Sequence, residues 1–155
     1  MLPIEQIHPA LVHFPIVLAL ILVSIDAVAT SRGRLLAGSS PLASISALLA
    51  TAMGSFVILT YLFGDQAYDV ALASGTPQSV LEIHQQLGTI TTIAMALWGA
   101  IRSGLWWRQV PFQGNTQRAI VGVEVVISGL VLFTAFFGGQ LVYEHGVGVL
   151  GSLSG

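Results

Sequence analysis

The sequence contains no cysteine and no lysine. Without cysteine, the protein can form no disulfide, no thiolate nucleophile, no zinc finger and no covalent c-type haem attachment. Its five cations are all arginines and are outnumbered by seven carboxylates, which gives a formal net charge of −2. A chain with this balance has no basic stripe, so nucleic-acid binding is excluded as a function class.

Charged residues are scarce as well. They make up 8% of the 155 residues, whereas a soluble domain has about 25%. Hydrophobic residues make up 54%, and the mean hydropathy is +0.84. The shortage of charge excludes an ordinary soluble globule, and the high hydrophobicity excludes a disordered chain. The composition therefore indicates a protein of the lipid bilayer.

Four apolar stretches are long enough to cross a membrane, which takes about 20 residues. They cover residues 9–30, 41–64, 83–105 and 119–143. We predict an all-α integral membrane protein whose residues 1–155 form a single transmembrane domain, a four-helix up-down bundle with both termini on the outward side. The segment before the first stretch carries Glu5 and no cation, so the first span is expected to be retained rather than cleaved as a signal peptide.

The arginines predict the orientation of this bundle. They lie in or beside the first and third loops, at positions 32, 34, 102, 108 and 118. These two loops share one end of an up-down bundle, and the positive-inside rule makes that end cytoplasmic. The segment 65–82 and both termini then face the periplasm or thylakoid lumen. We expect a multi-pass protein of a bacterial inner membrane or a thylakoid membrane.

All four histidines fall on the predicted outward side, although they come from three segments. They are His8, His13, His84 and His145. We place His13 and His84 about one turn inside their helices, near the boundary between headgroups and hydrocarbon. An ionisable residue embedded in a membrane is a functional-site hypothesis by default. The alternative is a neutral interfacial imidazole that is hydrogen-bonded to a loop carbonyl.

Two imidazoles on neighbouring helices are the axial ligands that a b-type haem needs. We take His13 and His84 as the preferred pair, and Gly88, one turn after His84, would leave room for the macrocycle. His8 and His145 could ligate a second haem, hydrogen-bond propionates or handle quinol protons. The hypothesis is a membrane b-type cytochrome-like protein with one or two haem b groups, which passes electrons between quinol and an outward-side redox protein.

Two other function classes stay open. A non-haem transition metal could be bound by the histidines together with Asp65, Asp69 or Glu82, although no defined zinc motif is present. A cofactor-free scaffold subunit of a larger membrane complex is the third class. The sequence assigns no enzymatic reaction. The small residues Ala43, Ala47, Ala50 and Gly54 allow close helix packing, within one chain or within an oligomer.

Three charged residues are expected near the cytoplasmic ends of their helices: Asp26, Arg102 and Glu124. A buried ion pair among them is the preferred interpretation, and a proton relay is the alternative. Two prolines shape the entry of the first helix. Either this helix starts at Pro9 and is distorted near Pro15, or it starts near Pro15 after an ordered re-entry.

Two runs of residues carry a resemblance to a known family. His8-Pro9-Ala10-Leu11-Val12-His13-Phe14-Pro15-Ile16 resembles an HPxxVHFPI opening, and residues 138–149 resemble a GGxLVYxHGxGV ending. These motifs, with His84 followed by Gly88, are similar to a bacterial family of predicted four-helix membrane proteins of unknown function. Relatives joined to Rieske-type or c-type cytochrome modules imply a redox setting, and the resemblance thus implies that the four histidines are cofactor-ligand candidates.

Overall fold

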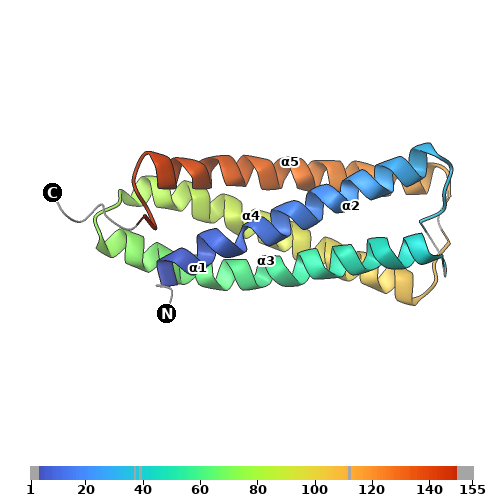
Figure 1. The fold of residues 1–155 in the computed structure, drawn as a ribbon, viewed down its shortest axis with the longest axis horizontal. Helices are drawn as coiled ribbons and strands as arrows, with labels where there is room; N and C mark the ends of the chain where they lie inside the picture. Colours follow the sequence, from blue (N-terminus) through green and yellow to red (C-terminus); the bar gives the residue numbers. More distant parts are fainter. Residues whose placement is uncertain (1–3, 37, 39, 112, 150–155) are drawn as a thin grey trace.

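A computed structural model describes residues 4–36, 38, 40–111 and 113–149, without the side chains of residues 4 and 5. These residues form five α-helices and no strand. The helices are α1 (Ile4–Leu11), α2 (His13–Ser31), α3 (Pro41–Ala73), α4 (Gln78–Trp107) and α5 (Asn115–Tyr143). The helices α1 and α2 lie end to end as one rod, and the four resulting rods run side by side in alternating directions (Figure 1). This confirms the predicted all-α up-down bundle.

The start of α1 and the end of α5 lie at the same end of the bundle, together with the short α3–α4 connection (Figure 1). We call this the histidine end. The loops after α2 and α4 lie at the opposite end, which we call the loop end. The outermost termini, residues 1–3 and 150–155, lie outside the described residues. The relative placement of loops and termini thus agrees with the sequence-based topology.

The rod formed by α1 and α2 is interrupted at Val12. Proline has no N–H to donate to the carbonyl of the preceding turn, so Pro15 leaves Leu11 without its helical partner. Beside this gap the Ile16 N–H donates to Val12 over a long 3.4 Å. The predicted distortion near Pro15 is therefore present, but the helix begins at Ile4, ahead of Pro9. The re-entry alternative is wrong.

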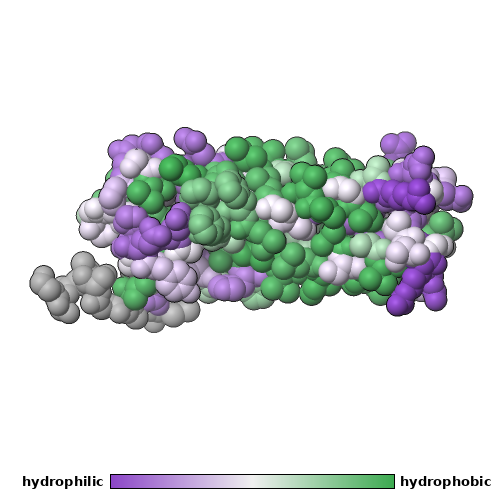
Figure 2. Space-filling view, turned by 90° about the horizontal axis from the view of Figure 1, so that it is seen from above, coloured by the Kyte–Doolittle hydropathy of each residue, from purple (hydrophilic) through white to green (hydrophobic). Residues whose placement is uncertain are grey.

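The helices also extend beyond the predicted apolar stretches. The helix α3 continues to Ala73, and α4 already begins at Gln78, so most of segment 65–82 is helical. Three rods are long and apolar enough to cross a membrane, namely Gln6–Ser31, α3 and α5. The helix α4 has 30 residues but more polar side chains, and it is not among these three. On the face shown in Figure 2, an apolar belt lies between two polar ends.

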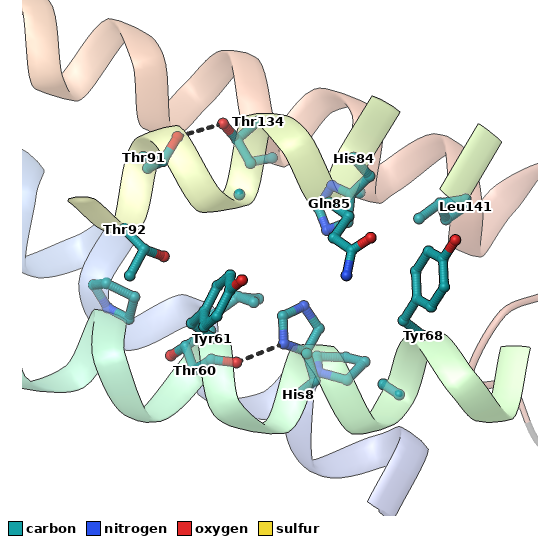
Figure 3. A pocket seen from close by; sticks show the side chains of 18 of the residues that line it. His8, Thr60, Tyr61, Tyr68, His84, Gln85, Thr91, Thr92, Thr134 and Leu141 are labelled. Carbon is teal, nitrogen blue, oxygen red and sulfur yellow. Dashed lines mark hydrogen bonds between the residues drawn. The ribbon is translucent and has the colours of Figure 1, made fainter. Parts of the chain in front are cut away.

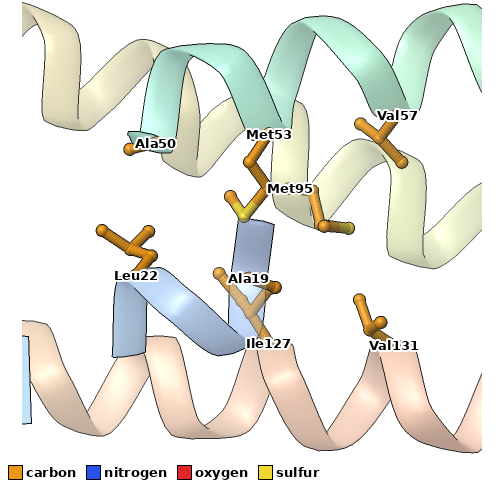
Figure 4. Packing of buried hydrophobic residues seen from close by; sticks show 8 residues of the cluster. All are labelled: Ala19, Leu22, Ala50, Met53, Val57, Met95, Ile127 and Val131. Atoms are coloured by element: carbon orange, nitrogen blue, oxygen red, sulfur yellow. The ribbon is translucent and has the colours of Figure 1, made fainter. Parts of the chain in front are cut away.

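The centre of the bundle is a small, closely packed core. Its buried side chains are Ala19, Leu22, Ala50, Met53, Val57, Met95, Ile127 and Val131 (Figure 4). The helices α3 and α4 approach each other through two glycines. A Cβ atom on Gly99 would lie 2.6 Å from the carbonyl oxygen of Ala50, and one on Gly54 would lie 3.3 Å from that of Met95. The small residues of α3 therefore serve packing within the chain.

Toward the loop end, the bundle buries a cluster of charged and polar groups. Arg102 Nη2 donates to Asp26 Oδ2 over 2.7 Å, and Arg102 Nε lies 3.6 Å from Glu124 Oε1. Ser46 and Trp98 also contact this cluster. The predicted buried ion pair is confirmed. Arg102 consequently lies inside the bundle and does not contribute to the loop-end charge, which comes from the exposed Arg32, Arg34, Arg108 and Arg118.

Candidate functional site

A cavity of about 460 Å³ opens at the histidine end between the helices. All five helices contribute to its wall, which is mostly apolar. Its main polar groups are His8 from α1, Tyr61 and Tyr68 from α3, and His84 and Gln85 from α4 (Figure 3). A cavity of this size lies within the range of small-molecule and cofactor sites, about 300–1,000 Å³. It is therefore the candidate functional site.

His8 is held at the cavity wall by α3. Its Nδ1 lies 3.0 Å from the main-chain carbonyl oxygen of Thr60 (Figure 3). Gly64, one turn after Thr60, leaves room for the ring, because a Cβ atom at position 64 would lie 2.8 Å from Cε1 of His8. A carbonyl acceptor fixes Nδ1 as the protonated nitrogen. The Nε2 lone pair of the neutral ring is then available as a ligand.

The ring of His84 packs against a glycine of α5, as the ring of His8 packs against a glycine of α3. A Cβ atom on Gly138 would lie 2.9 Å from Cε1 of His84. Any residue larger than glycine at position 138 would therefore displace the ring. Within the described part of the chain, the Nδ1 atom of His84 is buried and makes no hydrogen bond of normal geometry, although the main chain of Thr134 interacts with the imidazole. A buried polar atom without such a bond is costly. Such an atom at a cavity wall is therefore a candidate for an interaction with a bound group.

The structure brings these two imidazoles together. The ring centroids of His8 and His84 are 6.2 Å apart, and the ring planes are inclined by 78°. Metal–imidazole nitrogen bonds are about 2 Å long, so imidazoles on opposite sides of one ion have centroids about 6 Å apart. The separation of the pair is compatible with two axial ligands of one metal.

The other two histidines lie elsewhere. His13, at the first position of α2, borders the cavity, but its side chain is exposed. His145 follows the end of α5, is exposed and is not among the residues that line the cavity. Gly88 does line the cavity, and a Cβ atom there would meet nothing within 4 Å. Of the predicted ligands, the cavity thus combines His8 and His84 most directly.

The acidic residues of the non-haem alternative are engaged in other contacts or exposed. Asp65 accepts a hydrogen bond from Gln85 over 3.3 Å, and Glu82 accepts one from Gln78 over 2.7 Å. Asp69 is exposed. The described residues contain no group of three histidine or carboxylate side chains that could hold a metal ion.

The supporting contacts of the two rings could not be predicted from the sequence. The Thr60 carbonyl and Gly64 belong to a stretch that reads as a plain apolar span, and backbone groups leave no residue-type signal. Gly138 stands out in the sequence because it forms a Gly-Gly pair next to large apolar residues. Its contact with His84 depends on the rotation of α5 about its axis, which hydropathy does not fix.

Alanine at Gly138 is expected to displace the His84 ring, whereas alanine at the adjacent Gly139 is expected to leave it in place. The reason is that the added methyl group at position 138 would overlap the ring, while position 139 points toward Tyr143 at 4.0 Å. Nitrogen NMR of histidine-labelled protein in detergent measures the imidazole shifts of His84. Equal changes in the two variants would contradict the proposed contact.

Residues 5–151 match the family described as predicted membrane proteins, DUF2231. The chain belongs to this family. The match extends over all of α2 to α5 and over the four histidines. The description of DUF2231 confirms a membrane protein and names no activity. No curated protein and no solved structure matches the chain.

Proposed function

We propose that the protein is a membrane b-type cytochrome that holds haem in the cavity between His8 and His84. The single observation that carries this proposal is the pair of imidazoles from two helices with centroids 6.2 Å apart at an apolar cavity. A porphyrin occupies the equatorial positions of its iron, so the protein needs to provide only two axial ligands. A pair of histidines meets this need without a third protein ligand.

The surroundings of both rings support the proposal. Metal-binding histidines commonly donate their other N–H to a backbone carbonyl, which orients the ring and raises its basicity. His8 has such a contact with Thr60. His84 lines the same cavity, and Gly138 of α5 leaves the space that its ring occupies. The proposed pair thus retains His84 from the sequence-based pair and replaces His13 by His8.

When bound, haem supplies one-electron chemistry. The chain's own part is to fix the ligands and to exclude water through the apolar wall. We place the histidine end on the outward side of a bacterial inner membrane or thylakoid membrane, because the four exposed arginines lie at the loop end. The protein would then exchange electrons between membrane quinol and an outward-side redox protein. His13 and His145 remain available for propionates or for quinol protons.

The test is an absorption spectrum, reduced minus oxidised, of detergent-purified protein from cells supplied with haem, together with a pyridine haemochrome assay. We expect sharp α and Soret bands and one haem b per chain. A flat spectrum would end the haem proposal. Elemental analysis of such a colourless protein would then separate a bound non-haem metal from a scaffold without a cofactor.

A further inference from the structure

The buried charged cluster near the loop end contains one cation and two carboxyl groups. The relative exposures of the side chains are 2% for Arg102, 0% for Asp26 and 2% for Glu124. If both carboxyl groups were ionised, the bundle would carry an uncompensated negative charge at a position shielded from water. Burying an unpaired charge costs several kcal/mol, and such a group generally becomes neutral instead.

Among the residues that the structure describes, the contacts of the cluster named here include no further charged side chain. The cluster receives Asp26 from α2, Ser46 from α3, Arg102 and Trp98 from α4, and Glu124 from α5. The helix α3 has no charged residue before Asp65. On α5, the residue one turn after Glu124 is Ser128, whose buried hydroxyl has no partner in the described structure. The titratable groups that meet here are therefore the two carboxyl groups and the guanidinium.

Each carboxyl group also has one oxygen that lacks a donor. Asp26 Oδ2 accepts from Arg102 and from Ser46, each over 2.7 Å, and Glu124 Oε1 accepts from Trp98 over 3.3 Å. In contrast, Asp26 Oδ1 and Glu124 Oε2 are buried without a hydrogen-bond partner among the described residues. The two carboxyl groups lie close enough to interact with each other. A proton on one of the two unpaired oxygens would provide the missing donor.

The cluster is separated from the histidine cavity. Asp26 lies 18 residues after His8, and Arg102 lies 18 residues after His84. At a rise of about 1.5 Å per residue, each interval corresponds to about 27 Å along the bundle. The apolar core around Met53, Met95 and Ile127 lies between the two sites. The described polar side chains between the two sites include Thr91, which bonds to Thr134, and Ser128, whose hydroxyl has no partner, so they form no continuous hydrogen-bonded chain.

On the side that faces the loop end, the charged cluster borders a second, small cavity. This cavity has a volume of about 10 Å³ and is lined by Arg102 together with Leu36 and Val110 from the two loops. That size is at the lower limit for one water molecule, about 10–15 Å³. Water at the loop end is thus the nearest source of protons for the cluster.

We propose that Asp26 and Glu124 together bind one exchangeable proton, which Glu124 carries as a neutral carboxylic acid at neutral pH. The proton exchanges with water at the loop end. Asp26 remains ionised because Arg102 and Ser46 both donate to it, whereas Glu124 has the longer contact with the guanidinium. The protein thereby contains a membrane-embedded proton-binding site about 27 Å from the histidine cavity. This site does not depend on the proposed haem.

The test is infrared spectroscopy of the full chain at neutral pH, purified in a detergent that has no carbonyl group. A protonated carboxyl group has a C=O stretch that ionised carboxylates lack, and exposed acids are ionised under these conditions. We expect such a band in the wild type, with a shift in D₂O that reports exchange. Glu124→Gln should remove it. Asp26→Asn should remove it as well, because Glu124 then becomes the only counter-ion of Arg102.

The matched control is Glu144→Gln, which changes an exposed glutamate after α5 and should leave the band intact. Both test substitutions preserve the size and shape of the side chain, so we expect both variants to fold. Absence of the band in the wild type would overturn the proposal. Its persistence in either Glu124→Gln or Asp26→Asn would also overturn it, since the charge balance of the cluster could not then explain the bound proton.

Discussion

Alanine at His8 or at His84 is expected to abolish the low-spin haem b spectrum. Each substitution removes one of the two imidazoles whose centroids are 6.2 Å apart, and no third histidine or carboxylate among the described residues completes the group. The remaining histidine alone would leave the iron with one protein ligand and an open position. Absorption and electron paramagnetic resonance spectra of the purified variants measure the loss. Added imidazole should restore six-coordinate iron in both variants.

Alanine at His145 is the control, because this exposed residue does not line the cavity. Its variant should retain the full spectrum. Alanine at His13 distinguishes the two possible pairs. If His13→Ala abolishes the spectrum while His8→Ala retains it, the ligands are His13 and His84, and the pairing proposed from the structure fails.

Methionine at Arg102 is expected to lower the free energy of unfolding by about 3–5 kcal/mol, as for other buried ion pairs that lose one partner. Arg102 donates to Asp26 over 2.7 Å and also contacts Ser46 and Glu124. Without the guanidinium, two buried carboxyl groups would have no cation between them. Reversible denaturation in detergent or bicelles measures the difference.

Methionine at Arg108 is the matched control, since this exposed residue directly follows α4. We expect a change within about 0.5 kcal/mol, as is usual for surface positions. The double variant Arg102→Met with Asp26→Asn should recover part of the lost stability, because it also removes the carboxylate that Arg102 neutralised. Equal stability of the Arg102 and Arg108 variants would show that the cluster does not hold the bundle together.

The loop end illustrates what could not be predicted from the sequence. Gln117 is buried at the start of α5 and bridges the loop after α2. It accepts from the Leu36 N–H over 3.3 Å and donates to the Arg34 carbonyl over 2.7 Å and to Thr30 over 3.0 Å. A glutamine just ahead of an apolar stretch gives no such signal, because its partners are 81 to 87 residues away in the sequence.

The sequence by itself determined the fold class, the up-down order of the helices and the burial of Asp26, Arg102 and Glu124. These features follow from the lengths of the apolar stretches and from the depth of each charged residue, which hydrophobicity alone controls. It also indicated that the histidines gather at one end. Only the tertiary structure decided that His8, rather than the exposed His13, lies next to His84. That choice depends on the rotation of each helix about its axis, which close contacts at Gly64 and Gly138 fix.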